Sequence, residues 1–123
     1  MKKLISFIII LTINSCYLSR DNGIEMKINN ESNDALTNVT FTTSEKLEVV
    51  KIDRIDPNES VAEYLSMRKN KGDGSYLLTF IRTDGKQEKR SVGYYTNGGS
   101  LNQWVNFIVK KDTTLVNFDP PAY

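Results

Sequence analysis

The chain has 123 residues, no histidine, a single cysteine, and 16 basic against 15 acidic residues. It therefore lacks the commonest general base, the Ser-His and Cys-His nucleophile pairs, imidazole metal ligands and any internal disulfide. A formal charge of +1 gives no electrostatic reason to expect nucleic acid as a partner. We expect one small domain that is not an enzyme and holds no cofactor or metal ion.

The N-terminus has the pattern of a secretory signal peptide. Two lysines follow Met1, and eight of the ten residues at positions 4–13 are apolar. Ten residues of helix rise about 15 Å, half of the roughly 30 Å thickness of a bilayer core, so this segment is too short to span a membrane. The pattern predicts a helical signal peptide over residues 1–15.

The residues Ile13-Asn14-Ser15-Cys16 resemble the lipobox of bacterial lipoproteins, which is an aliphatic, a variable and a small residue before a cysteine. The resemblance implies cleavage before Cys16 and a diacylglycerol on its thiol, so that acyl chains such as palmitate bind the membrane. It also implies a location in the bacterial cell envelope, with the outer membrane or the cell surface expected. The alternative is an unmodified Cys16 thiol after an ordinary signal peptide or an uncleaved anchor.

The rest of the chain divides into three parts. Residues 16–23 are mostly polar and form the expected lipidated tether. About seven residues reach at most ~25 Å, which keeps the domain close to the membrane. Residues 24–119 form the expected β-sandwich domain, and residues 120–123 are a C-terminal tail.

Turn signals recur every eight to twelve residues after position 23, and β-branched and aromatic residues fill the runs between them. Asp84-Gly85 lies between two such runs and predicts a hairpin with a type I′ turn. The spacing and the absence of βαβ units predict an all-β, antiparallel two-sheet sandwich of seven to eight strands, with a small open barrel as the alternative. The expected strands are residues 24–28, 36–42, 46–52, 61–67, 75–82, 86–93, 103–110 and 115–118.

The domain resembles the small immunoglobulin-like domains of bacterial surface lipoproteins. Three features carry the resemblance: an early strand followed by Asn29-Asn30, the turn Pro57-Asn58-Glu59, and the strand at 74–82 that pairs through Asp84-Gly85. The resemblance implies an immunoglobulin-like architecture and no particular activity.

Two patterns could indicate catalytic or metal chemistry. Ser66 and Lys69 match the S-x-x-K spacing of penicillin-recognising enzymes, but ten serines and eleven lysines give about one match by chance, and the partner motifs are missing. Asp53, Asp56 and Glu59 could supply oxygen ligands to Ca²⁺, although their spacing favours a solvated turn. We expect neither site.

Aromatic residues are the better candidates for a binding site. Tyr94, Tyr95 and Trp104 flank a glycine-rich turn near several amide side chains, a combination that suits a glycan or a peptide. Neighbouring strand residues face opposite ways, so Tyr94 and Tyr95 cannot share one surface. Because large aromatics are usually buried, we favour the interpretation that one tyrosine and Trp104 fill the core.

These observations predict a lipid-anchored, non-enzymatic binding or accessory domain whose partner is a protein or a glycan. The alternative is an inhibitor or immunity-type lipoprotein that blocks an enzyme or toxin in the envelope.

Overall fold

The computed structural model describes residues 22–120, which form nine β-strands and no helix. Within these residues no helix is therefore long and apolar enough to cross a membrane. The strands are β1 (Gly23–Asn30), β2 (Leu36–Thr43), β3 (Val49–Ile55), β4 (Ser60–Ser66), β5 (Gly74–Ile81), β6 (Gln87–Thr96), β7 (Gly99–Ser100), β8 (Trp104–Val109) and β9 (Thr114–Phe118).

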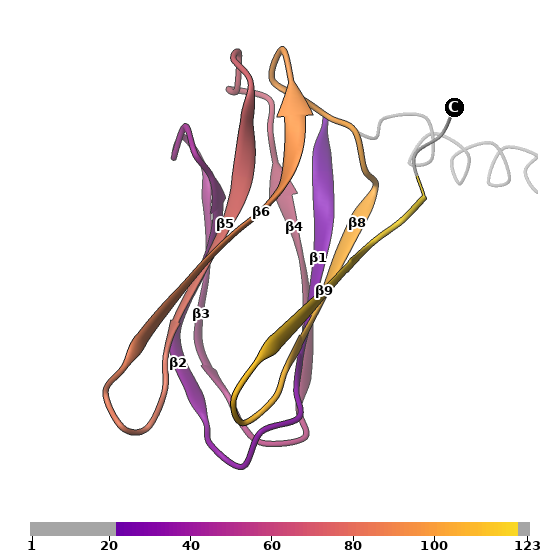
Figure 1. The fold of residues 1–123 in the computed structure, drawn as a ribbon. Helices are drawn as coiled ribbons and strands as arrows, with labels where there is room; N and C mark the ends of the chain where they lie inside the picture. Colours follow the sequence, from indigo (N-terminus) through magenta and orange to yellow (C-terminus); the bar gives the residue numbers. More distant parts are fainter. Residues whose placement is uncertain (1–21, 121–123) are drawn as a thin grey trace, which may run out of the picture.

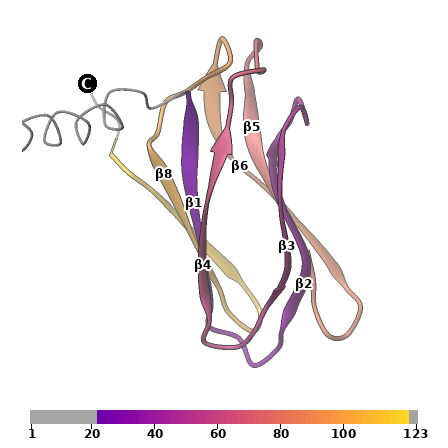
Figure 2. The same cartoon turned by 180° about the vertical axis from the view of Figure 1, so that it is seen from behind.

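The strands form two sheets that pack face to face (Figure 1). The four-stranded sheet has the order β4-β1-β8-β9, and the five-stranded sheet has the order β3-β2-β5-β6-β7. Seen from behind, β3 and β4 form the adjoining edges of the two sheets (Figure 2). The expected all-β, two-sheet sandwich is confirmed.

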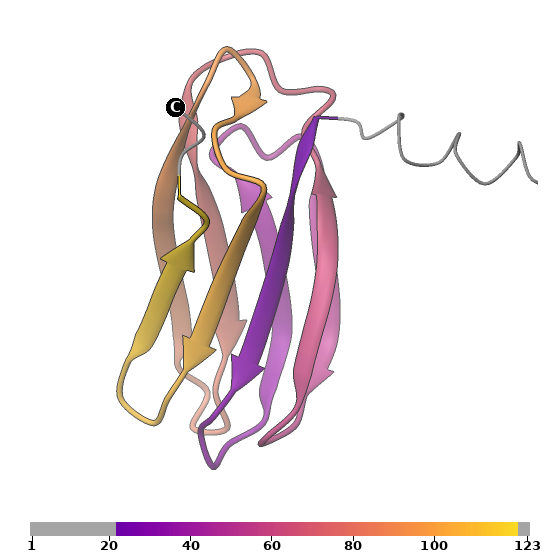
Figure 3. The same ribbon diagram turned by 90° about the vertical axis from the view of Figure 1, so that its right-hand side faces the viewer.

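Two details of that expectation are wrong. The described residues contain nine strands rather than seven or eight. The additional strand is β7, whose two residues follow the turn at Asn97-Gly98 and pair with the end of β6. The sheets are also not wholly antiparallel, since β1 and β8 pair in parallel (Figure 3). The chain crosses from β7 to β8 at the end of the sandwich where β1 begins, so the two strands run in the same direction.

The core lies between the sheets and follows the period-two alternation of the sequence in β1, β5 and β8. In β2 an irregularity in the pairing between Thr37 and Thr40 shifts the alternation by one residue. Each of β1, β2, β5 and β8 contributes three buried apolar side chains, and each such side chain stabilises the fold by about 1.5–3 kcal/mol. They are Ile24, Met26 and Ile28, then Leu36, Val39 and Phe41, then Tyr76, Leu78 and Phe80, and finally Val105, Phe107 and Val109.

A β-bulge in β6 decides which of two adjacent tyrosines is buried. Tyr76 of β5 pairs with Val92, and Gly74 pairs with Tyr95, so β6 has one residue more than β5 between the two pairs. Gly93 has a φ of +71°, a conformation that glycine adopts at no steric cost. The bulge shifts the alternation by one residue, so Tyr95 points into the core and Tyr94 points out.

The hairpin between β5 and β6 forms as expected, but its turn is not type I′. Gly85 has a φ of +84°, whereas Asp84 is not in the positive region. The Gly85 amide donates to the Arg82 carbonyl (2.9 Å), and the Arg82 amide donates to the Lys86 carbonyl (3.0 Å). This is a three-residue loop with a bulge at Gly85, a common alternative to the two-residue turn.

The type I′ geometry occurs instead between β6 and β7. Thr96 pairs with Gly99, and the two residues between them, Asn97 and Gly98, have φ values of +50° and +73°. Asn-Gly is the sequence best suited to this turn.

Candidate binding face

The structure separates the three aromatic residues that the sequence singled out. Tyr95 is buried, and its hydroxyl donates to Glu45 Oε1 (2.8 Å). Tyr94 lies on the outer side of the five-stranded sheet and is 52% exposed, whereas Trp104 lies on the outer side of the four-stranded sheet and is 41% exposed. The expectation that Trp104 fills the core is therefore wrong. Cys16, the expected lipidation site, lies outside the described residues.

Trp104 points outward because its neighbour Val105 points inward. Val105 is fully buried, and alternation along β8 places Trp104 and Asn106 on the opposite face. Because Val105, Phe107 and Val109 occupy the core side of β8, Trp104 lies on the outer side, although tryptophan is usually buried.

The register of the four-stranded sheet places a second aromatic residue near Trp104. Glu25 of β1 pairs with Tyr64 of β4 on one side and with Trp104 of β8 on the other. Neighbouring strands lie about 4.8 Å apart, so Tyr64 and Trp104 are roughly 10 Å apart on one face. Tyr64 is 46% exposed. We call the surface made by Glu25, Lys27, Tyr64, Trp104 and Asn106 the Trp104 face.

A shallow depression of about 250 Å³ lies beside the indole, and it is lined by Glu25, Lys27, Trp104, Val105 and Asn106. Among residues 22–120, the Glu25 carboxylate, the Lys27 ammonium and the Asn106 Nδ2 group have no hydrogen-bond or ion-pair partner. One acceptor group and two donor groups therefore converge on an apolar ring.

The position of Trp104 is fixed by its backbone. The Asp119 carboxylate accepts hydrogen bonds from the Gln103 amide (2.9 Å) and from the Trp104 amide (3.3 Å). These bonds hold the start of β8 against the end of β9.

The orientation of Asn106 is fixed by a chain of side-chain hydrogen bonds. Asn29 Nδ2 donates to Asn106 Oδ1 (2.7 Å), and Ser60 Oγ donates to Asn29 Oδ1 (2.6 Å). The Asn106 Nδ2 group is consequently directed away from Asn29. A ligand would meet a preformed surface, which lowers the entropic cost of binding.

The backbone around the depression has no capacity for further hydrogen bonds. β1 lies between β4 and β8, and β8 lies between β1 and β9. Both strands are therefore paired on both sides, and only side chains can recognise a ligand here.

The patterns that suggested catalysis or metal binding do not assemble into sites. Within residues 22–120 no three acidic or cysteine side chains are grouped so as to hold a metal ion. Asp56 accepts a hydrogen bond from Arg54 Nε (2.6 Å) on the surface. Lys69 lies 4.0 Å from the Glu48 carboxylate, and Ser66 Oγ accepts from the Arg68 amide (3.5 Å).

A perturbed carboxylate lies away from the Trp104 face, in the loop after β2. The Tyr95 hydroxyl, and then the Lys71 amide (3.2 Å), donate to Glu45 and lower its pKa below the ordinary value of 4.5. The Gly72 amide adds a further bond (3.3 Å). This carboxylate ties a core tyrosine to the loop before β5 and has a structural role.

Sequence reasoning missed Glu25, Lys27 and Tyr64 as members of the candidate site. Alternation along residues 24–28 and 61–67 was sufficient to place all three outward. It could not show that β1 lies between β4 and β8, because those pairings join segments far apart in the sequence.

No protein-family model matches the chain, and no curated protein matches its sequence. Among solved structures, the fold is similar to that of a protein from Eubacterium rectale determined by NMR, with a TM-score of 0.53. The match covers 80% of this chain and 89% of that chain at 10% sequence identity. The likeness concerns the fold alone and transfers no activity.

Proposed function

We propose that the protein is a lipid-anchored, non-enzymatic binding domain of the bacterial cell envelope and that the Trp104 face is its binding surface. The observation that carries this proposal is an exposed indole beside an unpaired carboxylate, ammonium and amide group on a rigid sheet. An aromatic ring with polar groups beside it in a surface depression is typical of binding sites.

The resemblance of Ile13–Cys16 to a lipobox supports the anchor. β1 begins at Gly23, seven residues after Cys16, so a lipid on Cys16 would hold the domain within about 25 Å of the membrane. Since the first residues of β1 and β8 lie side by side, the Trp104 face would start at the end of the sandwich nearest the tether.

The immunoglobulin-like architecture is part of the same proposal, and strand order supports it. β4-β1 in one sheet and β3-β2-β5-β6 in the other correspond to strands E-B and C′-C-F-G of an immunoglobulin domain. The departure is β8, which lies on the other side of β1 and runs parallel to it.

The anchor is tested by replacing Cys16 with serine. We expect the wild-type protein to take up radiolabelled palmitate and to enter the detergent phase of a Triton X-114 extraction. The Cys16→Ser variant should remain an unlabelled, unprocessed precursor. Processing and partitioning like those of the wild type would contradict the proposal.

An inhibitor of an envelope enzyme or toxin is the second candidate, and the edge strand β9 favours it. The edge strands β3 and β4 contain charged side chains, and so does the part of β6 that the two-residue edge strand β7 leaves unpaired. The edge strand β9 has the uncharged sequence TLVNF. Uncharged edges readily accept a strand from another chain. If β9 captures a protein, replacing the outward residues Leu115 and Asn117 by lysine should abolish co-purification of that protein and leave the fold intact.

A further inference from the structure

We infer that the ligand of the Trp104 face is a neutral carbohydrate chain, an inference that rests on the proposed binding function. Three properties of the face support it: its charge balance, the chemistry of its polar groups, and the saturation of its backbone.

The charge of the face indicates an uncharged ligand. Glu25 contributes one negative and Lys27 one positive charge to the depression, and its other lining residues are neutral. A nucleic acid or an acidic polysaccharide would require several unpaired basic side chains. The depression contains one, with a carboxylate beside it.

The polar groups match the hydroxyl groups of a sugar. Each hydroxyl both donates and accepts, so it can donate to Glu25 and accept from Lys27 or Asn106 Nδ2. The C–H face of a pyranose ring is apolar and flat enough to pack on the Trp104 indole. A depression of about 250 Å³ can hold a single pyranose ring, which would contact two or three polar groups of the face.

The second aromatic residue suggests that the ligand is a chain rather than a monosaccharide. Tyr64 lies two strands from Trp104, across Glu25. Its ring lies against Gly23, where a Cβ atom would collide with the tyrosine hydroxyl. The absence of a side chain at Gly23 therefore lets the tyrosine lean over the start of β1. A linked second sugar could contact this ring.

The backbone around the depression argues against an extended peptide ligand. One common way to bind an extended peptide is by main-chain hydrogen bonds to a sheet edge. β1 and β8 are interior strands and offer no unpaired edge. A carbohydrate needs only the side chains that this face presents.

The chain offers a direct probe, because Trp104 is its only tryptophan. The full-length protein would be purified in a polyoxyethylene detergent, since a sugar-based detergent would compete. Its fluorescence would be titrated with hexasaccharides of β-1,4-glucose, β-1,4-N-acetylglucosamine, β-1,4-mannose and α-1,4-glucose. We expect one of these to change the emission saturably and to protect Trp104 from acrylamide quenching.

Variants identify the surface that binds, with affinity measured by calorimetry. Trp104→Ala should weaken binding at least tenfold, and Glu25→Gln or Lys27→Ala several-fold, because each removes one contact. Tyr94→Ala is the matched control, since it removes an exposed aromatic ring from the other sheet and should leave affinity unchanged. Equal losses for Tyr94→Ala and Trp104→Ala would overturn the assignment.

Other outcomes separate the failure of this inference from the failure of the proposed function. If none of the four sugars changes the emission at millimolar concentration, the carbohydrate inference is wrong, while palmitate labelling still tests the anchor. A response of Trp104 to a tryptic casein digest, or to phosphatidylglycerol vesicles, without a response to sugars would also overturn it. Each of those results would show that the face binds peptide or lipid instead.

Discussion

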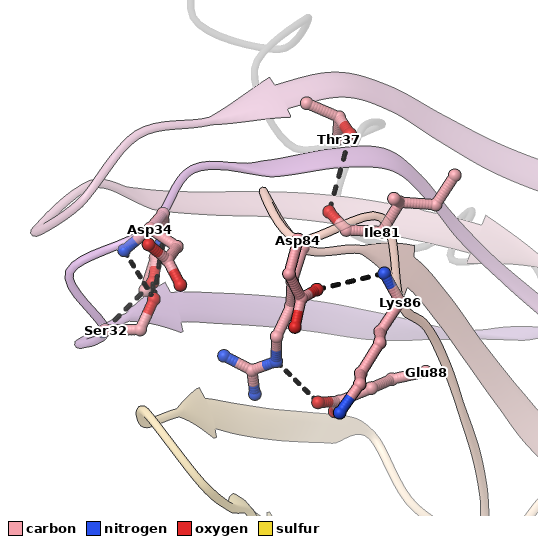
Figure 4. Close-up of polar contacts among 9 residues, drawn as sticks. Ser32, Asp34, Thr37, Ile81, Asp84, Lys86 and Glu88 are labelled. Atoms are coloured by element: carbon pink, nitrogen blue, oxygen red, sulfur yellow. Dashed lines mark hydrogen bonds and ion pairs between the residues drawn. The ribbon is translucent and has the colours of Figure 1, made fainter.

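The ion pair between Arg82 and Glu88 at the β5–β6 hairpin gives a sharp prediction about stability. Arg82 is only 7% exposed, and its Nε atom donates to Glu88 Oε1 (2.5 Å). Figure 4 shows Glu88 and the nearby hydrogen bond from the Lys86 amide to Asp84. Within residues 22–120, the two terminal guanidinium nitrogens of Arg82 are buried without a hydrogen-bond partner. Removing one partner of the pair should therefore destabilise the fold strongly, whereas the intact pair contributes little net stability.

The two partners should respond very differently to substitution. Glu88→Ala leaves a buried guanidinium with no partner. A fully buried pair costs 3–5 kcal/mol to break, and because the Glu88 side chain is 30% exposed we expect about 2–3 kcal/mol. Arg82→Met removes the charge and its unpaired nitrogens, but it loses the stacking of the guanidinium over Phe80, 5.4 Å from the ring centre. That contact contributes about 0.5–2 kcal/mol, and removal of the unpaired buried nitrogens offsets most of its loss, so the free energy of unfolding should change by less than about 1 kcal/mol.

Thermal unfolding followed by circular dichroism measures both effects. A loss of 2–3 kcal/mol corresponds to a fall in Tm of roughly 10–20 °C for a domain of this size. We expect that fall for Glu88→Ala and a Tm within about 5 °C of wild type for Arg82→Met. A larger loss for Arg82→Met than for Glu88→Ala would refute the reasoning, because it would show that the terminal nitrogens are paired in solution.

Three further predictions concern the core and the loops. The lowered pKa of Glu45 contributes stability that is complete above the ordinary value of 4.5 and is lost as the pH falls through the lowered pKa. Glu45→Gln should therefore lower Tm at pH 7, and this effect should shrink as the solution is made more acidic; an effect that grows with acidity would contradict this sign. Because Tyr95→Phe removes the hydrogen bond that lowers this pKa most, that variant should show a weaker dependence of Tm on pH than the wild type. Gly98→Ala should cost roughly 1–3 kcal/mol in chemical denaturation, because its φ is +73° and a Cβ would collide with the Asn70 carbonyl; an unchanged midpoint would be evidence against that geometry. Phe107→Ala should cost about 3–5 kcal/mol, because the ring is fully buried between the sheets, and a loss below 1 kcal/mol would show that the ring is not part of the core.

The strands and their inward faces could be predicted well because they depend on local patterns. The alternation of Ile24, Met26 and Ile28 and that of Val105 and Phe107 determine which side chains enter the core, and all five are buried. Turn residues between these runs set the strand boundaries.

The errors occurred where a general tendency competed with a local pattern. The size of Trp104 suggested burial, yet alternation with Val105 already placed it outside, and alternation was the better guide. Gly93 is a glycine inside a strand, which is a known signal of a bulge. That signal could have identified Tyr95 rather than Tyr94 as the buried tyrosine.

The composition of the binding face could not be predicted, because it depends on which strands are neighbours. Glu25 and Trp104 are 79 positions apart in the sequence and adjacent in the sheet through a parallel pairing. Parallel pairing leaves no short-range signal, since its two strands are joined by a long connection rather than by a turn.

The role of the Trp104 face in binding is tested most directly by a fluorescence titration of Trp104 with neutral hexasaccharides, carried out in parallel on the wild type and the Tyr94→Ala variant. We expect a saturable change in emission for at least one sugar, with the same midpoint in wild type and Tyr94→Ala. An emission that stays constant with every sugar, while the protein remains folded, would contradict this expectation.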